Sequence, residues 1–371
     1  MLYLYMVSVV LILGFYQKRI SKICFYVSLL VLLILSAFRS LSMGLTDSIV
    51  YKDYFDACYN ISYFSFNDFS NFKILYILLN SLIKTFTADF LCFQIIYNCI
   101  CFIILIYLFN SLKLSNREKC ALLFVYLCYR FIWNEWVVLR QNIAVLIFWL
   151  MFIRFWKNLN NCCERFVRYC DIVILIFIPY LFHSSGIVNI ALIPVLLLLS
   201  KLNDKERIFI TLTASIFIFC TSSFFDKFII GVLMESVDER YSMYLNRDSE
   251  AINAISLIFK IVTYIIYYYI LSYCKDINNC KERNTRLFIS CLTSVYIILS
   301  SFNNSLIMRM SEYYAIGFYL MMVFVITHSF RYGLCGKLIR GGYFFGLMII
   351  LFHFCLVTDG GIYMEYSFYE H

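Results

Sequence analysis

The sequence predicts an all-α protein, a polytopic bundle of transmembrane helices, on three observations. Of its 371 residues, 63% are hydrophobic and only 15% are charged, whereas a soluble globular protein has about 45–50% apolar and about 25% charged residues. Long apolar runs recur from one end of the chain to the other, and only two prolines interrupt them. We therefore expect a single integral membrane domain over residues 1–371.

About twelve runs are apolar enough to be spans. They lie near residues 2–15, 23–38, 90–110, 119–133, 140–156, 170–183, 186–200, 207–224, 252–273, 286–302, 312–330 and 342–357. A bilayer needs about 20 helical residues, so the shorter runs should extend by a few residues. The first run lacks a basic n-region and a small-residue cleavage site, which makes it a retained span rather than a signal peptide.

The loops between these runs alternate in basic charge. One set, near residues 18–22, 113–119, 154–168, 201–207, 275–286 and 331–340, holds 20 of the 31 Lys and Arg residues, and the opposite set holds 10. The positive-inside rule makes the first set cytoplasmic. Both termini are then predicted on the outer side.

Two segments, 39–89 and 225–251, are the large outer-face segments of this topology. Residues 72–87 are apolar enough to enter the bilayer, but a span there would invert every later loop against the charge rule. We therefore expect a re-entrant or interfacial helix near 72–87. The second segment mixes apolar and charged residues at helical spacing, which is typical of a helix that lies on a membrane surface.

The net charge is +8. In a membrane protein, Lys and Arg residues reflect the orientation of the chain in the membrane, so no nucleic acid is expected as a partner. Many of the 16 cysteines lie in apolar runs, where free Cys behaves as a small hydrophobic residue. The sequence has no P-loop, GxGxxG, HExxH, EF-hand or DxD-type pattern. We expect neither a metal nor a cofactor, and ATP-driven transport is disfavoured.

Three arginines, Arg39, Arg140 and Arg309, lie at the ends of different spans on the outer side. A guanidinium group keeps its charge when desolvated and donates two parallel hydrogen bonds to phosphate. Anchoring to lipid headgroups is the alternative, but anchoring would use Lys as often as Arg. The pattern favours a lipid phosphate or pyrophosphate as the ligand.

Three outer residues are candidate acid–base groups. His183, in PYLFHSSG, is suited to accept a proton near neutral pH, although a polar cap at the interface is an equal alternative. Asp47 shares a helical face with Tyr51 and Phe55, which suits sugar binding, or else it belongs to an N-cap. Glu135 lies in WNEW, and the sequence leaves open an interfacial aromatic belt or a sugar-contacting patch.

Four motifs in this order resemble one family. GLTDSIVYKDYF resembles a GTDxxxYxxxF signature, and VLRQNIAVLIFWLMF resembles an RQxxA helix start at Arg140, Gln141 and Ala144. HSSGIVNIALIPVLLLL contains His183, Ser185 and Pro194, and MRMSEYYAIGFYL contains Arg309 and Tyr313. Over roughly 36–320 their order and spacing resemble the bacterial EpsG-type and Wzy-type polysaccharide polymerases.

This resemblance implies an O-antigen or polysaccharide polymerase at the periplasmic face of the bacterial inner (cytoplasmic) membrane. Such an enzyme transfers a growing glycan from undecaprenyl pyrophosphate to the non-reducing end of a lipid-linked repeat unit, without a metal. Its partners would be undecaprenyl-pyrophosphate-linked glycans, membrane lipid and a chain-length regulator protein.

The resemblance and the residue chemistry together give a predicted site. Arg39, Arg140 and Arg309 would bind the pyrophosphates. His183 is the first candidate base, Asp47 the second and Glu135 the third. Gln141, Tyr51, Glu312 and Tyr313 are predicted to contact substrate.

Three other classes compete with this prediction. An O-antigen ligase shares the lipid-pyrophosphate chemistry, and only the motif order favours a polymerase. A flippase or other secondary transporter usually shows paired half-repeats and broken helices, and no such repeat is visible here. A membrane O-acyltransferase tends to place a His in its first spans, and the first two runs contain none.

Overall fold

A computed structural model describes residues 2–63, 72–160, 165–234, 254–273, 280–302, 305–357, 363 and 366–369. In this part of the chain every named element is a helix, and the only β pairing is one isolated bridge between Arg39 and Phe368. The predicted all-α class is confirmed. The chain divides into two compact units, Met1–Gly186 with Ser329–His371, and Ile187–His328. That both belong to one membrane domain stays a prediction.

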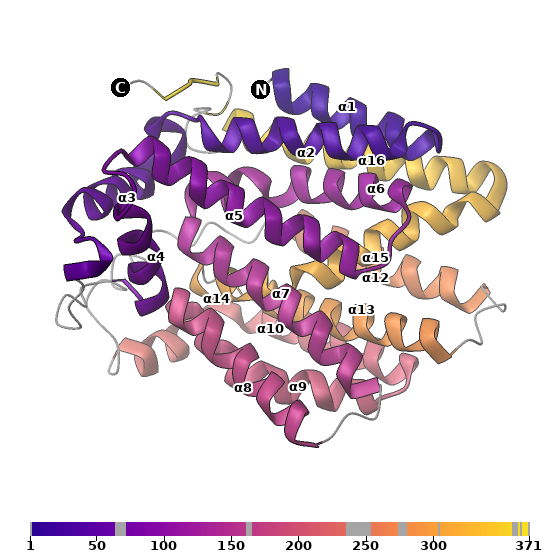
Figure 1. Ribbon diagram of the computed structural model, residues 1–371. Helices are drawn as coiled ribbons and strands as arrows, with labels where there is room; N and C mark the ends of the chain where they lie inside the picture. The colour runs from indigo at the N-terminus through magenta and orange to yellow at the C-terminus, as the bar shows by residue number, and fades with distance from the viewer. Residues whose placement is uncertain are drawn as a thin grey trace. The chain divides into compact units, whose positions relative to one another are not determined.

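Unit 1 contains most of the helices (Figure 1). They are α1 (Leu2–Tyr16), α2 (Ser21–Ala37), η1 (Leu41–Gly44), α3 (Leu45–Ala57), η2 (Ile61–Tyr63), α4 (Ile74–Lys84), α5 (Phe90–Ser111), α6 (Asn116–Tyr126), the π-helix η4 (Leu127–Val137), α7 (Leu139–Asn160), α8 (Arg165–Phe182), η8 (Ser329–Tyr332) and α16 (Gly333–Val357). Local capping fixes two starts. The Asp89 carboxylate accepts from the Leu91 N–H, and Ser115 and Glu118 form a capping box at α6.

Helix α6 is the centre of unit 1. Residues 120–126 are at most 1% exposed, so the helix is covered on every side after its first turn, which is half-buried. A helix that is apolar all round is expected in a core. It packs against α1, α2 and η4.

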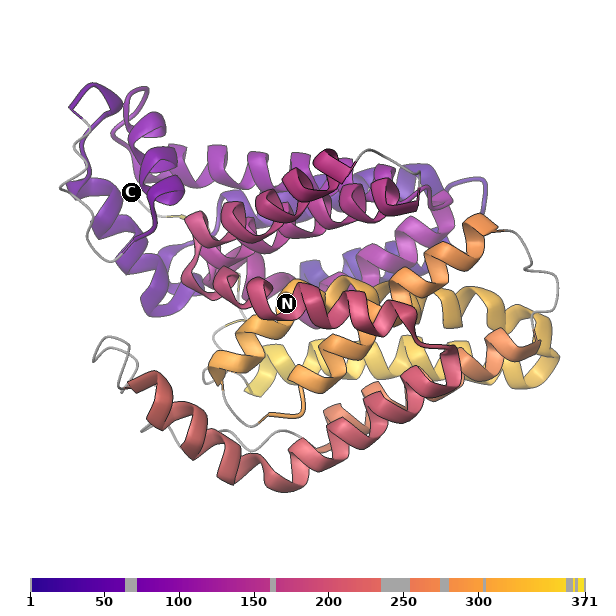
Figure 2. The ribbon, with the colours of Figure 1, turned by 90° about the horizontal axis from the view of Figure 1, so that it is seen from below.

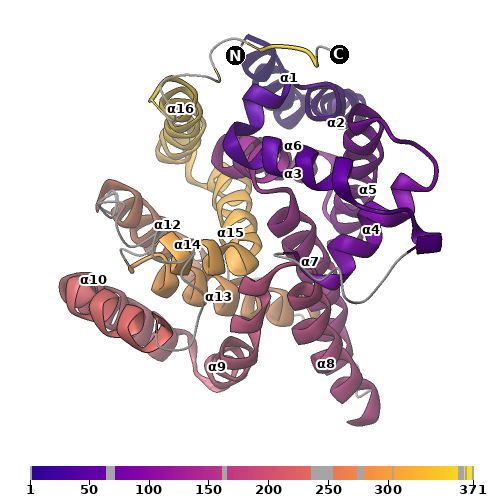
Figure 3. The ribbon, with the colours of Figure 1, turned by 90° about the vertical axis from the view of Figure 1, so that its left-hand side faces the viewer.

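The loops of unit 1 sort to two ends. The α2–η1 turn, α3, α4 and the start of α7 gather at one end, at the left of Figure 1, and Figure 3 looks onto that end. The α1–α2, α5–α6 and η8–α16 turns lie at the other end. These are the predicted outer and cytoplasmic sets respectively, so the charge alternation groups the loops of this unit as the structure does.

Unit 2 is built around α15 (Ala315–His328). Its other elements are α9 (Asn189–Lys201), α10 (Asp204–Met234), α12 (Ala254–Tyr273), α13 (Cys280–Leu299), α14 (Ser305–Ser311) and η7 (Glu312–Tyr314), and η5 (Ser184–Val188) crosses from unit 1. Residues 315–323 are all buried, and α15 packs against α12 and α13. Figure 2 shows α10 as a long, bent rod.

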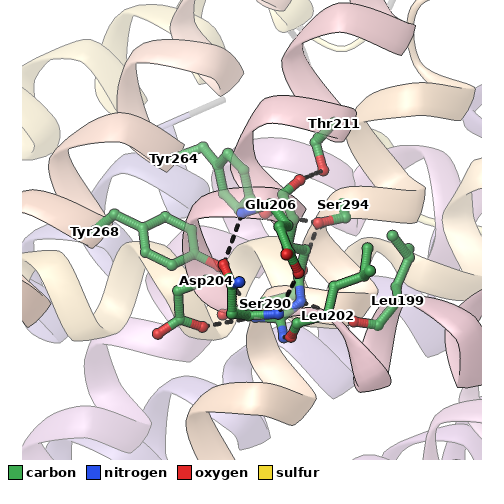
Figure 4. Close-up of polar contacts among 11 residues, drawn as sticks. Leu199, Leu202, Asp204, Glu206, Thr211, Tyr264, Tyr268, Ser290 and Ser294 are labelled. Atoms are coloured by element: carbon green, nitrogen blue, oxygen red, sulfur yellow. Dashed lines mark hydrogen bonds and ion pairs between the residues drawn. The ribbon is translucent and has the colours of Figure 1, made fainter.

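One buried cation fixes the turn between α9 and α10. Arg207 is 1% exposed and donates to the carbonyls of Leu199 at 3.1 Å and Leu202 at 2.6 Å. It also donates to the Asp204 carboxylate at 2.8 Å and the Tyr268 hydroxyl at 3.3 Å (Figure 4). Its donors close the C-terminal end of α9, so this member of the predicted cytoplasmic set has a structural role.

The predicted count of about twelve spans is not confirmed. Within the described ranges, five helices are long and apolar enough to cross a membrane: Phe90–Ser111, Leu139–Asn158, Ser184–Lys201, Arg309–His328 and Gly333–Leu356. Six shorter apolar helices accompany them: Leu2–Tyr16, Ser21–Ala37, Ile74–Lys84, Cys170–Phe182, Ser256–Ser272 and Asn284–Leu299.

The structure describes only part of the two outer-face segments, 39–89 and 225–251. A helix is present within 72–87, but α4 has 11 residues, about half the length that a span needs. Its re-entrant or interfacial placement stays a prediction. In 225–251, α10 continues to Met234, and the remainder lies outside the described residues.

Candidate functional site

Seven of the ten predicted site residues belong to unit 1, and the elements that carry them end at its predicted outer end (Figure 1). They are Arg39, Asp47, Tyr51, Glu135, Arg140, Gln141 and His183. The other three, Arg309, Glu312 and Tyr313, lie in α14 and η7 of unit 2.

Arg140 lies against aromatic rings. Its Cζ is 4.4 Å from the Phe72 ring centroid and 5.7 Å from that of Tyr51. Phe72 in turn contacts Tyr54 at 4.1 Å and Tyr76 at 5.6 Å between centroids. We call these five residues the Arg140 aromatic cluster. A guanidinium over ring faces is stabilised by cation–π attraction, and its planar fork matches the geometry of a phosphate.

Local sequence explains how the cluster forms. Tyr51 and Tyr54 are three residues apart on α3, so they share a face, while Tyr76 lies in the first turn of α4. Helix α7 begins at Leu139, directly after Val138 leaves helical geometry at φ −99° and ψ 57°. Arg140 is thus in the first turn of α7, half-buried beside both helices. Three separate segments meet here, and the sequence signals only Arg140 and Tyr51.

The predicted sugar-binding face of α3 is mostly interior. Tyr51 is 3% exposed and Phe55 is 0% exposed, and Phe55 packs against Phe90 and Phe93. Tyr54 is half-buried and is the ring of this helix that remains accessible in the cluster. Helix α3 begins at Leu45 with Gly44 at the N-cap, so the alternative that Asp47 is part of an N-cap is wrong. Asp47 lies in the first turn, half-buried.

Arg39 is fully buried, at 0% exposed. It donates to the carbonyl of Ser36 at 2.6 Å and to that of Trp136 at 3.0 Å, which links the end of α2 to the end of η4. Burial lowers the pKa of Arg39 to about 10, and the nearby charge of Glu135 acts in the opposite direction, so the group stays charged at neutral pH. Its assignment to a pyrophosphate stays a prediction, but its present contacts are structural.

Glu135 is also at 0% exposure. Its carboxylate accepts from the Tyr126 hydroxyl at 2.7 Å and from the Asn142 amide at 2.9 Å. Tyr126 is nine residues away, which is two and a half turns of an α-helix and hence the opposite face. The wider π turns of η4, with i→i+5 hydrogen bonds, bring the two residues to one side.

The tryptophan beside this carboxylate is interior as well. Trp136 is 1% exposed and donates to the Ser36 hydroxyl at 3.1 Å. Of the two alternatives for WNEW, the structure gives Trp136 neither a belt nor a sugar-facing position. Gln141, 3% exposed, follows in the first turn of α7.

His183 follows the last residue of α8. Its Nδ1 accepts from the Ser185 N–H at 3.2 Å and lies 2.7 Å from the Ser185 hydroxyl. A backbone N–H can only donate, so Nδ1 is an acceptor and the neutral ring carries its proton on Nε2. His183 can accept a proton at Nδ1 from a substrate hydroxyl only after Nδ1 has lost its contacts with Ser185.

Lys73, which the sequence did not single out, connects this histidine to the cluster. Its Nζ donates to the Tyr180 hydroxyl at 3.2 Å and lies 4.4 Å from the ring centroid. The contact joins the start of α4 to the last turn of α8, three residues before His183. The two partners are 107 positions apart, so no local pattern reveals the pair.

In unit 2, Glu312 and Tyr313 are buried, at 2% and 0% exposed, while Arg309 is half-buried. The neighbouring Tyr314 donates to the Asn189 amide oxygen at 2.8 Å, which fixes η7 against α9. Among the residues that the structure describes, no group of three or more His, Cys, Asp or Glu side chains is placed to hold a metal ion. Metal independence stays a prediction.

Comparison with known proteins identifies the family. No curated protein and no solved structure matches the chain. A model of the EpsG family matches residues 22–371, which is nearly the whole chain and more than the 36–320 range covered by the motifs. The chain belongs to the EpsG family.

Proposed function

We propose that this protein is a polysaccharide polymerase that uses lipid-pyrophosphate-linked glycans at the outer face of the bacterial inner membrane. The observation that carries the proposal is the family match over residues 22–371. The Arg140 aromatic cluster supports it, because a guanidinium beside aromatic rings is suited to a sugar phosphate.

The reaction is a glycosyl transfer. The bond between the anomeric carbon of the growing glycan and the pyrophosphate oxygen breaks, and a bond to a hydroxyl of the next lipid-linked repeat unit forms. The hydroxyl proton passes to a base, and undecaprenyl pyrophosphate leaves with the bonding electron pair. Pyrophosphate is a good leaving group, so the protein has to stabilise its charge and orient two lipid-linked sugars.

Arg140 is the strongest candidate for the leaving group. Rings on its flanks hold the guanidinium plane, and half-burial strengthens its interaction with a phosphate oxygen. Tyr54, as the accessible ring of the cluster, would stack on a pyranose. Arg309 and buried Arg39 are proposed as further cations for the pyrophosphates.

His183 remains the first candidate base. It would exchange its Ser185 contact for the acceptor hydroxyl, and the Lys73–Tyr180 contact would hold the end of α8 while it does so. Asp47, in the first turn of α3, is the second candidate.

A purified-enzyme assay with lipid-linked repeat units tests the proposal. Wild-type protein should give a ladder of chain lengths, whereas Arg140→Ala and His183→Ala should remain in the membrane and leave single repeats. Arg19→Ala, a variant at an exposed side chain, serves as the charge-matched control and should keep the ladder. Transfer of a finished glycan to a lipid acceptor without any ladder would show a ligase instead.

A further inference from the structure

Two arginines share one aromatic ring at the predicted cytoplasmic end of unit 1. The Cζ of Arg340 is 3.4 Å from the Phe330 ring centroid, and that of Arg117 is 5.3 Å from it. Arg117 also lies 5.3 Å from the Phe15 ring and donates to the Phe15 carbonyl at 2.6 Å. Helices α1, α6 and α16 and the segment η8 thus converge on two cations.

The charge of this pair is not neutralised by the described residues. Arg340 is 4% exposed, and its Nε and Nη1 are buried with no hydrogen-bond partner in the ranges that the structure describes. Neither arginine pairs with a carboxylate there. A ring face attracts a cation but provides no hydrogen-bond acceptor, and a buried charge without one is costly. The buried donors of Arg340 are therefore suited to an anionic acceptor.

The surface beside the pair is apolar. Leu334 is 73% exposed, Leu338 is 68% exposed and Phe345 is 70% exposed on α16. At Gly341 and Gly342, which directly follow Arg340, nothing lies within 4 Å of where a side chain would begin. One buried and one half-buried cation next to open apolar helix surface match an amphiphile, with its anionic head on the arginines and its chain along α16.

We propose that Arg117 and Arg340 bind the phosphodiester headgroup of an anionic phospholipid in the cytoplasmic leaflet. Forked guanidinium donors match the two free oxygens of a phosphodiester, and basic pockets between helices on the cytoplasmic side of a membrane suit such headgroups. The site consists of different elements from the Arg140 aromatic cluster, and it does not depend on the proposed polymerase activity.

The test is the thermal stability of the purified full chain in a neutral detergent with added lipid. Phosphatidylglycerol should raise the unfolding midpoint more than phosphatidylcholine with the same acyl chains. In the double variant Arg117→Gln/Arg340→Gln this difference should disappear, and native mass spectrometry should show at least about tenfold weaker phosphatidylglycerol binding, since two charge-assisted donors are lost. Arg19→Gln, with the same change at an exposed position, should behave as wild type.

Three outcomes would overturn the proposal. The first is an equal response to both lipids in the wild type, and the second is an undiminished difference in the double variant. The third is a full response to inorganic phosphate alone, which would assign the site to a soluble anion. If the double variant does not fold, Arg117→Gln alone replaces it, because Arg117 is only half-buried, and its phosphatidylglycerol binding should still fall.

Discussion

At the residue scale, Arg39 and Arg140 differ in burial: Arg39 is fully buried and Arg140 is half-buried. Both are arginines at the ends of apolar runs, and the sequence assigns both to pyrophosphate. The structure separates them. Arg39 is fully buried and donates to two backbone carbonyls, whereas Arg140 is half-buried against rings from two other segments. Residue type indicates what chemistry a side chain offers, but tertiary neighbours decide whether a ligand reaches it.

The aromatic contacts of Arg140 predict that a positive charge alone at this position is insufficient for polymer formation. Arg140→Lys keeps a cation but loses the planar fork and the stacking on Phe72, so we expect at least about tenfold less polymer. The membrane level of the protein should stay unchanged. Product ladders in the lipid-linked repeat assay measure this, with Arg19→Lys at an exposed position as the control. A wild-type ladder from Arg140→Lys would show that only a point charge is needed.

The buried contacts of Glu135 predict that substitutions there change the stability of the fold rather than the chemistry. Glu135→Ala leaves the Tyr126 hydroxyl and the Asn142 amide without their acceptor, which costs about 1–3 kcal/mol for each buried group. Glu135→Gln keeps an acceptor oxygen of the same shape and should lower the unfolding midpoint less. Thermal unfolding of both variants measures the difference.

The same pair of variants tests the third candidate base. If Glu135 is structural, Glu135→Gln should retain the product ladder. Loss of the ladder in a normally folded Glu135→Gln protein would instead place this carboxylate in the chemistry.

At the element scale, the apolar runs predict where helices lie but not their internal hydrogen bonding. The run near 90–110 corresponds to α5, Phe90–Ser111, and the run near 140–156 lies within α7, Leu139–Asn160. The run near 119–133 contains a change from α to π geometry at Leu127. Hydrophobicity reports burial, and a change of hydrogen-bond register inside a continuous helix leaves burial nearly unchanged.

The end of α2 depends on an element that the sequence did not link to it. The Tyr366 hydroxyl donates to the Leu35 carbonyl at 2.9 Å, and the Ser40 and Tyr369 N–H groups pair with the Ser367 and Phe38 carbonyls, both at 2.9 Å. Gln94 from α5 donates to the Ala37 and Arg39 carbonyls. These contacts satisfy carbonyls that the end of a helix leaves open, so residues 366–369 hold the turn that carries Arg39.

Removing residues 363–371 should therefore lower the unfolding midpoint. Tyr366→Phe alone deletes one hydrogen bond and should cost about 1 kcal/mol. Phe368→Ala is the matched control, because that side chain is 56% exposed and the backbone bridge to Arg39 stays. Thermal unfolding of the three variants gives the order, and equal stability of the truncated and full chains would show that the bridge is not needed.

At the scale of the whole molecule, basic-residue alternation groups loops well and says little about which side chains meet. It assigns 113–119 and 331–340 to one side, and the structure brings Arg117 and Arg340 of these loops onto one ring. The Arg140 aromatic cluster was not predictable in the same way, because Phe72 and Tyr76 carry no charge that marks their side.

The alternation also makes a prediction about the complete topology, which depends on α4. If the chain has twelve spans and α4 is not one of them, both termini lie outside and the 275–286 loop lies inside. If the α4 segment spanned, the count would become odd and the termini would lie on opposite sides. Epitopes at the N-terminus, at the C-terminus and within 275–279 should distinguish these cases in spheroplasts. We expect antibody binding at both termini without permeabilisation, and at the internal epitope only after it. A hidden C-terminus beside an accessible N-terminus would make the number of spans odd and would contradict the predicted topology, in which α4 does not cross the membrane.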